Sequence, residues 1–405
     1  MKLIDRKLGE GLHVKHGFAF LGEFFSDEGK YILLTPGNFY EEGGFKARPE
    51  KDRFYTGTFP NDYILQKGDL IVAMTEQGPG LLGSAALIPE GGIYLHNQRL
   101  GLVDKINPEI FEKRYLFHIF NSRSVRSQLY GSATGTKVKH TSPGRIYKVK
   151  VSVPEVQKQA DISSIVENYF ELIEINRKKI QLLEETARFL FREWFVYFRF
   201  PGYEKAKFED RDGIQTPVGW EEEKLSKYVV FKRGVEPGTD NYLESQESDT
   251  YPFYRVSDLI TRKPEIFVDE LHTKGALVEK GDIVVSLDGS VGIVSMGLEG
   301  CYSSGIRKLM IKGERINRAF LYYLMKSYYI QGIISAYSKG TTIQHAGEAI
   351  KHMNPVLPSQ NLIDKFGLIV EPMIDEILTQ FDQNQKLAQA RDLLLPRLMS
   401  GKIEV

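Results

Sequence analysis

The chain has 405 residues, equal numbers of acidic and basic side chains, and one cysteine, Cys301. This length is too great for one ordinary domain, and a single cysteine excludes an intrachain disulfide and a cysteine-rich zinc site. A net charge of zero argues against a generic basic nucleic-acid binder, and the longest apolar runs are too short to span a membrane.

The first predicted domain covers residues 1–153 and is β-rich. It begins without an apolar signal region, which predicts a cytoplasmic protein. Short strand-like runs begin at Tyr31, Asp69 and Arg99, and glycines separate them. A helical pattern follows around residues 108–130. From residue 105 to 150 the chain carries ten Lys or Arg against two acids, a local charge of +8.

The segment 154–200 is predicted to be a long spacer helix. Its apolar residues alternate at spacings of four and three, which is the pattern of a coiled-coil seam with one polar member, Asn176. The seam consists of Ile162, Val166, Tyr169, Ile173, Asn176, Ile180, Leu183, Ala187 and Leu190. A buried asparagine in such a seam often fixes the register of the two helices.

The second half repeats this order. Residues 201–356 are predicted as a second β-rich domain, with strand-like runs from Tyr251, Asp282 and Lys308 and a helical pattern around 317–337. Its basic zone, residues 301–351, holds eight Lys or Arg against two acids, a local charge of +6. Residues 357–405 are predicted as the second spacer helix.

A repeated loop establishes that the two halves are equivalent. Gly135-Thr136 precedes His140 as Gly340-Thr341 precedes His345, and the two histidines lie 205 residues apart. Gly68-Asp69 corresponds in the same way to Gly281-Asp282. Two equivalent units imply two equivalent targets, or one target with approximate two-fold symmetry, and paired basic zones attract phosphate backbones.

The predicted fold class is α+β, with two tandem β-rich domains that are each followed by a long helix. We expect the helices to form an antiparallel intramolecular coiled coil with pseudo-two-fold symmetry, because a whole domain returns the chain between them. The alternative is that each helix packs on its own domain. About 35 residues of helix span about 50 Å, which exceeds the 34–36 Å, roughly, of one B-DNA turn.

In the order of these elements the chain resembles the specificity subunit of type I restriction–modification systems. The resemblance covers the whole chain. It rests on the loops "GTKVKH" and "GTTIQHAG", the proline followed by a glutamine at each helix start (Gln157, Gln360), the central "LLEETARFLFREWFVYFRFPG", "PVGWEEEKL" and the terminal "LLLPRLMSGKIEV". No single motif is diagnostic, but their order and duplication are specific.

The resemblance implies a non-catalytic DNA-targeting subunit. In that family each target-recognition domain reads one half of a split double-stranded DNA site. The helices space the domains and dock two methyltransferase (M) subunits, which bind S-adenosylmethionine and methylate adenine. Restriction (R) subunits, which use ATP and Mg, join the full complex. We therefore expect no cofactor or metal on this subunit and no membrane partner.

Catalytic motifs are absent from the sequence. An adenine methyltransferase needs an Asn/Asp-Pro-Pro-aromatic loop, whereas Asn354-Pro355 is followed by Val356. Gly131 to Lys137 does not have the spacing of a phosphate-binding loop. Asp288-Gly289 after a strand is predicted as a turn.

The candidate DNA-binding residues lie in the Gly-Thr loops and at differing or basic positions near them. Glycine permits close approach, hydroxyl, amine and imidazole groups can donate to DNA, and Gln344 can pair with adenine. The predicted set is Arg99, Thr136, Lys137, Lys139, His140, Arg262, Lys263, Arg307, Lys308, Thr341, Thr342, Gln344 and His345. The alternatives are that the loop residues cap a turn, and that Arg99 and Arg307 form salt bridges on the sheet.

Specificity should reside where the two halves differ, as in residues 38–51 against 257–264, so we expect an asymmetric target. A second function from another class is a coiled-coil adaptor that binds proteins and has no DNA affinity. The paired basic zones favour the DNA-targeting function.

Overall fold

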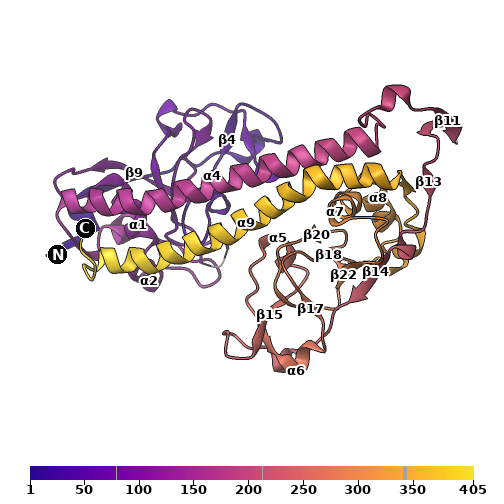
Figure 1. Cartoon of the computed structure of the whole chain (residues 1–405). Helices are drawn as coiled ribbons and strands as arrows, with labels where there is room; N and C mark the ends of the chain where they lie inside the picture. The colour runs from indigo at the N-terminus through magenta and orange to yellow at the C-terminus, as the bar shows by residue number, and fades with distance from the viewer. Residues whose placement is uncertain (79, 212, 341–343) are drawn as a thin grey trace. The chain divides into compact units, whose positions relative to one another are not determined.

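The computed structural model, shown in Figure 1, describes residues 1–78, 80–211, 213–340 and 344–405. The chain forms two compact units. Unit 1 comprises Met1–Leu172 with Leu387–Val405, and unit 2 comprises Ile173–Lys386. Each unit thus contains one β-rich domain and a section of both long helices. None of the helices in the described ranges has an apolar stretch long enough to span a bilayer.

Unit 1 contains two four-stranded sheets and one two-stranded ribbon. The first sheet has the order β2-β9-β6-β7, the second has the order β3-β5-β4-β8, and β1 pairs with β10. The strands are β1 (Ile4–Lys7), β2 (Leu12–His16), β3 (Phe25–Ser26), β4 (Tyr31–Leu33), β5 (Phe54–Tyr55), β6 (Leu70–Ala73), β7 (Ala85–Leu87), β8 (Tyr94–Leu95), β9 (Leu100–Ile106) and β10 (Lys150–Val153). The helices of this domain are α1 (Lys113–Asn121), α2 (Arg123–Gly131) and α3 (Pro143–Ile146).

Unit 2 repeats this plan. Its sheets have the orders β14-β22-β18-β20 and β16-β15-β21-β17, and its ribbons are β11-β12, β13-β24 and β19-β23. The strands are β11 (Phe208–Arg211), β12 (Ile214–Pro217), β13 (Glu221–Glu222), β14 (Val229–Arg233), β15 (Thr250–Tyr254), β16 (Phe267–Asp269), β17 (Leu277–Val278), β18 (Ile283–Ser286), β19 (Asp288–Gly289), β20 (Val294–Ser295), β21 (Gly300–Tyr302), β22 (Ile306–Ile311), β23 (Gln344–His345) and β24 (Val356–Leu357). The helices are α5 (Asp258–Thr261), α6 (Glu270–Thr273), α7 (Arg318–Met325) and α8 (Tyr328–Ala336).

The strands predicted from Asp69 and Asp282 are the fully buried strands β6 and β18, and both lie inside a sheet rather than at its edge. Each second sheet has one parallel pair, β4 with β8 and β15 with β21. The turn predicted at Asp288-Gly289 is instead the short strand β19, because these residues pair with His345 and Gln344. The repeat is therefore a repeat of topology as well as of sequence.

Each predicted helical segment after the sheets is divided into two helices by a serine. Ser122 and Ser327 have extended ψ angles of 144° and 152°, which end the first helix. The same serine hydroxyl accepts a hydrogen bond from the third residue of the next helix, at Val125 and Ile330 respectively. Ser122 is thus both the C-cap of α1 and the N-cap of α2, whereas in unit 2 Lys326 is the C-cap of α7 and Ser327 is the N-cap of α8.

The two long helices are α4 (Val156–Phe195) and α9 (Gln360–Met399), each of 40 residues. In unit 2, Asn176 donates from Nδ2 to Oδ1 of Asn384 at 3.0 Å, and further along α4 the ring of Phe191 packs on Phe366, which comes earlier in α9. In unit 1 the Arg391 guanidinium lies over the ring of Phe170. The helices run antiparallel, as predicted (Figure 1).

Burial confirms the predicted seam on α4, because every one of its positions is buried or half-buried, including Asn176 at 8 % exposure. The helices also contribute to the domain cores. Ile162 and Val166 belong to the apolar core of unit 1, and Phe191 packs on Phe320 in the core of unit 2. The helix pair is therefore anchored to a domain in each unit.

Candidate nucleic-acid interface

In unit 1 the first Gly-Thr loop is a tight hairpin that lies against the end of β6. The backbone groups of Thr134 and His140 bond to each other at 3.0 and 2.7 Å. The hairpin is joined to the sheet because Glu76 N–H donates to the carbonyl of Lys139 and Thr141 N–H donates to the carbonyl of Met74, both at 2.9 Å. The loop is therefore held rigidly at one edge of a buried strand.

Unit 2 builds the same arrangement at the end of β18. The backbone groups of Lys339 and His345 bond to each other at 3.1 and 2.8 Å, and Ala346 N–H donates to the carbonyl of Leu287 at 2.7 Å. Gln344 pairs with Gly289 in the β19-β23 ribbon. The predicted residues Thr341 and Thr342 lie outside the described residues. Two equivalent loops thus occupy two equivalent strand ends.

The glycine of the first loop is required by its geometry. Gly135 has a φ of +102°, and a Cβ there would lie 2.0 Å from the carbonyl oxygen of Val138. A side chain would therefore be strained in its backbone conformation and would clash with backbone that closes the hairpin. Gly340 has a similar φ of +113°.

The loop side chains project from the protein. Thr136, Lys137 and His140 are exposed and Lys139 is half-buried, with its amine 5.5 Å from the ring centre of Tyr130. Gln344 and His345 are exposed in the second loop. Every described loop residue of the predicted set thus carries donors that can reach a ligand, as phosphate and base contacts require.

Each loop histidine is oriented by the residue that follows the buried strand. In unit 1 the Nδ1 of His140 lies 3.1 Å from the Thr75 hydroxyl, and in unit 2 the Nδ1 of His345 lies 2.7 Å from a carboxylate oxygen of Asp288. Thr75 and Asp288 are equivalent positions, since both lie seven residues after Gly68 and Gly281. The partner is neutral in one unit and acidic in the other.

Arg99 and Arg307 occupy equivalent places but have different surroundings. The Arg99 side chain is exposed, and its carbonyl accepts from Met74 N–H beside the loop. The Arg307 side chain is only 10 % exposed and forms an ion pair with Asp288 at 3.1 Å. Burial lowers the pKa of the Arg307 guanidinium from its ordinary value, and the Asp288 carboxylate opposes that shift. Asp288 therefore joins Arg307 and His345 into one cluster.

Three other predicted residues lie apart from this cluster. The Arg262 guanidinium covers the ring of Phe381 in α9 at 3.7 Å and donates to the carbonyl of Met296. Lys308 pairs with Asp282 at the opposite end of β18. Lys263 is exposed after the left-handed Arg262. The structure brings Arg307 and His345 together but does not bring these three to them.

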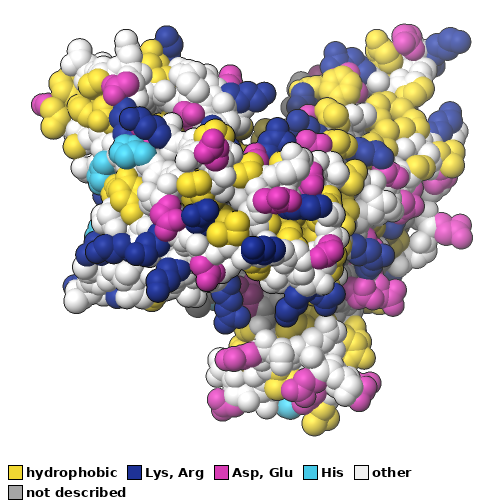
Figure 2. Space-filling view, turned by 90° about the vertical axis from the view of Figure 1, so that its left-hand side faces the viewer, with side chains coloured by type: hydrophobic (Ala, Val, Ile, Leu, Met, Phe, Trp, Pro, Cys, Tyr) yellow, Lys and Arg dark blue, Asp and Glu magenta, His cyan; other side chains and the backbone are white. Residues whose placement is uncertain are grey.

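The two basic zones differ in how their charges are compensated. Of the ten cations between residues 105 and 150, only Arg114 forms a salt bridge with a carboxylate among the described residues. Of the eight between 301 and 351, six are in salt bridges, namely Arg307, Lys308, Arg315, Arg318, Lys326 and Lys351. On the face drawn in Figure 2, Lys and Arg side chains are interspersed with Asp and Glu side chains.

Sequence reasoning missed the residues that support the loops. The sequence could have identified Thr75 and Asp288 as equivalent positions, because each lies seven residues after the glycine of a repeated Gly-Asp pair. Arg126 of α2 had none. Its guanidinium donates to the carbonyls of Leu82 and Glu41 at 2.8 and 3.0 Å and so fixes the loop after β6 to the helix.

The described side chains do not form a metal centre, because no three His, Cys, Asp or Glu residues among them gather closely enough to hold an ion. The arrangement is suited to binding rather than to bond-making. It offers exposed donors on rigid hairpins, with a neutral environment in unit 1 and an acidic one in unit 2.

Comparison with known proteins gives consistent relatives. The sequence profile of the type I restriction modification DNA specificity domain matches residues 4–185 and 217–392. The MjaIX specificity subunit of a type I restriction enzyme of Methanocaldococcus jannaschii is 24 % identical, over 72 % of this chain and 69 % of the relative. The HindI specificity subunit of Haemophilus influenzae is 23 % identical, over 64 % and 70 % respectively.

A solved structure shares the fold. The crystal structure of the S subunit of a type I restriction-modification system from M. genitalium matches with a TM-score of 0.62 at 17 % identity, covering 98 % of this chain and 96 % of that one.

Proposed function

We propose that this chain, which belongs to the type I restriction–modification DNA specificity family, selects the DNA site on which its complex acts. Membership of the family implies sequence-specific DNA recognition within a restriction–modification system, and a specificity subunit is not itself an enzyme. The observation that carries the proposal is the rigid, donor-bearing hairpin found at the same strand end in both units.

Each unit, in this proposal, reads one half of a split double-stranded site. The support is that the two hairpins share backbone geometry but differ in side chains. Lys137 and Lys139 occupy the first loop, whereas the second carries Gln344 beside an acidic Asp288. Different side chains recognise different base edges, so the target is asymmetric.

The unit 1 hairpin supplies more of the phosphate attraction, because its zone is largely uncompensated while that of unit 2 is ion-paired. Arg99, Thr136, Lys137, Lys139 and His140 are the proposed contacts there. In unit 2 we propose Gln344, His345 and Lys263 as contacts, together with Thr341 and Thr342, and Arg307 as the residue that positions Asp288. Arg262 and Lys308 are proposed to act on DNA only through the fold that they stabilise.

The long helices are proposed to set the spacer between the half-sites and to dock two methyltransferase subunits. Forty residues of α helix measure about 60 Å. In unit 2, α4 also presents exposed apolar side chains at intervals of seven residues, which is the spacing of a second helix-binding stripe. They are Ile175, Leu182 and Phe189, between 56 % and 63 % exposed, and Val196, one residue after the end of α4, continues the spacing at 48 % exposure.

The chemistry is proposed to lie on partner subunits in the cytoplasm. Methyltransferase subunits would bind S-adenosylmethionine, and restriction subunits would use ATP and Mg. This chain would supply binding and orientation only.

Mapping of adenine methylation in cells that carry this chain and a partner methyltransferase tests the proposal. We expect methylation at one split, asymmetric motif, which is lost when this chain is deleted. Methylation that is unchanged by the deletion, or a palindromic motif, would contradict it and favour the protein-binding adaptor.

Purified chain with labelled duplex DNA of that motif tests the residues. Replacing Lys137 and Lys139 with alanine should lower the slope of log affinity against log salt by about 2, roughly one per phosphate contact. Lys67→Ala is the matched control, because Lys67 is exposed at the opposite end of β6. Equal effects from both changes would refute the assignment of the hairpin.

A further inference from the structure

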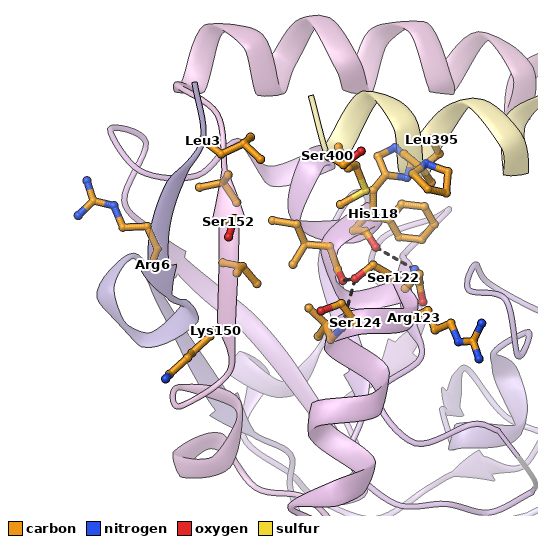
Figure 3. Close-up of a pocket in the computed structure, with 18 of the residues that line it drawn as sticks. Leu3, Arg6, His118, Ser122, Arg123, Ser124, Lys150, Ser152, Leu395 and Ser400 are labelled. Atoms are coloured by element: carbon orange, nitrogen blue, oxygen red, sulfur yellow. Dashed lines mark hydrogen bonds between the residues drawn. The ribbon is translucent and has the colours of Figure 1, made fainter. Parts of the chain in front are cut away.

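A groove of about 1020 Å³ opens on unit 1 (Figure 3), and no residue of the Gly-Thr hairpin belongs to its lining. The β1-β10 ribbon forms one wall, and the junction of α1 and α2 forms another with the last turns of α9. Its apolar lining includes Leu3, Phe117, Val125, Val151, Leu395 and Met399. The proposed DNA function gives this groove no role.

One wall of the groove is an open strand edge. Leu8 N–H donates to the carbonyl of Val149 at 3.0 Å, and bonded and non-bonded pairs alternate along an antiparallel ladder. The registered partners Lys7–Lys150 and Asp5–Ser152 are therefore the non-bonded pairs. The backbone groups of Lys150 and Ser152 consequently point away from β1, toward the groove side of β10.

A side chain already imitates an added strand at the first of these positions. The Gln128 side-chain amide donates to the carbonyl of Lys150 at 2.8 Å and accepts from its N–H at 2.9 Å. At Ser152, one step along the same edge, no partner for the backbone groups is found in the described part of the chain. Along this edge of β10 the backbone groups of Lys150 are thus hydrogen-bonded, whereas those of Ser152 are free to bond to another strand.

The rim of the groove has uncompensated positive charge. Arg6 pairs with Glu10, and Arg391 pairs with Asp392. Lys7, Arg123 and Lys150 have no carboxylate partner among the described residues, whereas two lining acids, Asp5 and Glu42, have no cationic partner there, so the cations exceed the acids by one. Figure 3 shows Lys150 on the ribbon side and Arg123 on the helix side, so the charges flank the groove.

The groove wall also contains a polar atom without a partner. His118 is 2 % exposed, and its Nε2 makes no hydrogen bond within the described residues. Its ring stacks on the ring of Phe170, and the guanidinium of Arg391 lies over the same Phe170 ring. A buried unsatisfied nitrogen is costly, which is a second sign that the groove is incomplete without a ligand.

We propose that this groove binds an extended, acidic segment of a partner polypeptide, which adds as a strand to the edge of β10. Strand addition uses backbone hydrogen bonds for affinity and alternate side chains for specificity. Side chains on one face of the segment pack on the apolar lining, and acidic side chains on the other face meet Lys7, Arg123 and Lys150. A DNA backbone would satisfy the cations but leave the apolar lining and the strand edge unused.

Selection from a display library of random dodecapeptides on the full chain tests the proposal. We expect enrichment of sequences in which Asp or Glu alternates with apolar residues. The absence of enrichment over chance, or enrichment of basic sequences, would overturn it.

Variants then locate the site for a selected, fluorescein-labelled peptide. Ser152→Pro removes the open donor, and Arg123→Glu with Lys150→Glu reverses the rim charge without altering the strand. We expect each to weaken peptide binding by about tenfold or more, and the uncharged change Ser152→Pro to leave duplex DNA affinity within about twofold. The matched control is Lys148→Glu, at an exposed lysine outside the groove, which should leave peptide binding within about twofold.

Two results would refute the assignment. One is an equal loss of peptide affinity in Lys148→Glu and in the rim variant. The other is loss of duplex DNA affinity in the rim variant with peptide affinity intact, which would make the groove a DNA site. Circular dichroism of each variant separates a local effect on binding from unfolding. If Ser152→Pro unfolds, the double variant Arg123→Glu with Lys150→Glu alone tests whether the peptide binds in the groove.

Discussion

Replacement of Asp288 with asparagine is the sharpest test of the unit 2 cluster. The change keeps the shape of the side chain but removes the charge that faces Arg307 at 3.1 Å and His345 at 2.7 Å. The Arg307 side chain is 10 % exposed and that of Asp288 is 17 % exposed, so the ion pair is mostly shielded from water. The variant therefore leaves a nearly buried cation without its counter-ion.

The expected cost follows from the remaining contacts. Removing one member of a fully buried ion pair leaves the other charge unpaired and costs about 3–5 kcal/mol, and a hydrogen bond to a charged group contributes about 1.5–3 kcal/mol. Arg307 keeps hydrogen bonds to the carbonyls of Ser304 and Ile306, so the lower range applies. We expect unit 2 to lose about 2 kcal/mol, which lowers the melting temperature of a unit of this size by about 4–8 °C.

Calorimetry provides the stability measurement, and a second variant isolates the charge. In the double variant Asp288→Asn with Arg307→Gln no cation is left unpaired, so the combined loss should be smaller than the sum of the single losses. Thr75→Val in unit 1 is the matched neutral case, because it removes only the hydroxyl beside His140, at about 0.5–1.5 kcal/mol.

The same variant should change DNA binding in a defined direction. Removal of the carboxylate leaves one more positive charge at the hairpin, so the salt slope for duplex DNA should steepen by about 0.9 and discrimination at one half-site should relax. A change in unfolding free energy below about 0.5 kcal/mol, additive single losses, or an unchanged salt slope would refute the reasoning.

Three further predictions concern single features of the fold. Gly135→Ala should cost at least about 1–2 kcal/mol and abolish recognition by unit 1 in a binding assay, whereas Gly131→Ala, where a Cβ meets open space, should not. Asn176→Leu alone should lower the free energy of unfolding by about 1–2 kcal/mol, because the side chain of Asn384 loses its hydrogen-bond partner. The double variant with Asn384→Leu should restore that free energy, and stabilisation by the single change would contradict the prediction. Burial lowers the pKa of His118 from 6.5 to about 4. The contribution of the neutral His118 to the free energy of unfolding is therefore complete above pH 6.5 and is lost, by at most about 3 kcal/mol, as the pH falls toward 4. In urea unfolding the His118→Phe variant should lose less stability than the unchanged chain over that pH range, and parallel curves of stability against pH would disprove this.

The elements of this protein are predictable because their signals are local. A run such as Leu70–Ala73 is apolar throughout and becomes a strand buried on both faces. The four-and-three spacing along α4 defines its buried seam, including Asn176, because side-chain direction in a helix depends only on position. Equivalent loops at His140 and His345 predict an equivalent fold. The serines at 122 and 327 were missed as helix boundaries, since serine at a cap and serine in a helix differ only in backbone angle.

What each basic side chain does was decided by tertiary structure. Arg307 and Arg99 are equivalent in sequence, yet one is ion-paired and the other exposed, because position 288 is acidic and position 75 is not. Arg262 is a residue type that commonly contacts DNA, and the sequence predicts it as such a contact. In the structure its guanidinium instead covers the ring of Phe381, which lies far along the chain in α9. The net charge of a sequence window counts its own residues only, whereas the field at a surface depends on every carboxylate that the fold brings near it. The chain alone therefore determined the repeat, the helices and the strand positions, and only the folded structure determined which cations remain available to a ligand.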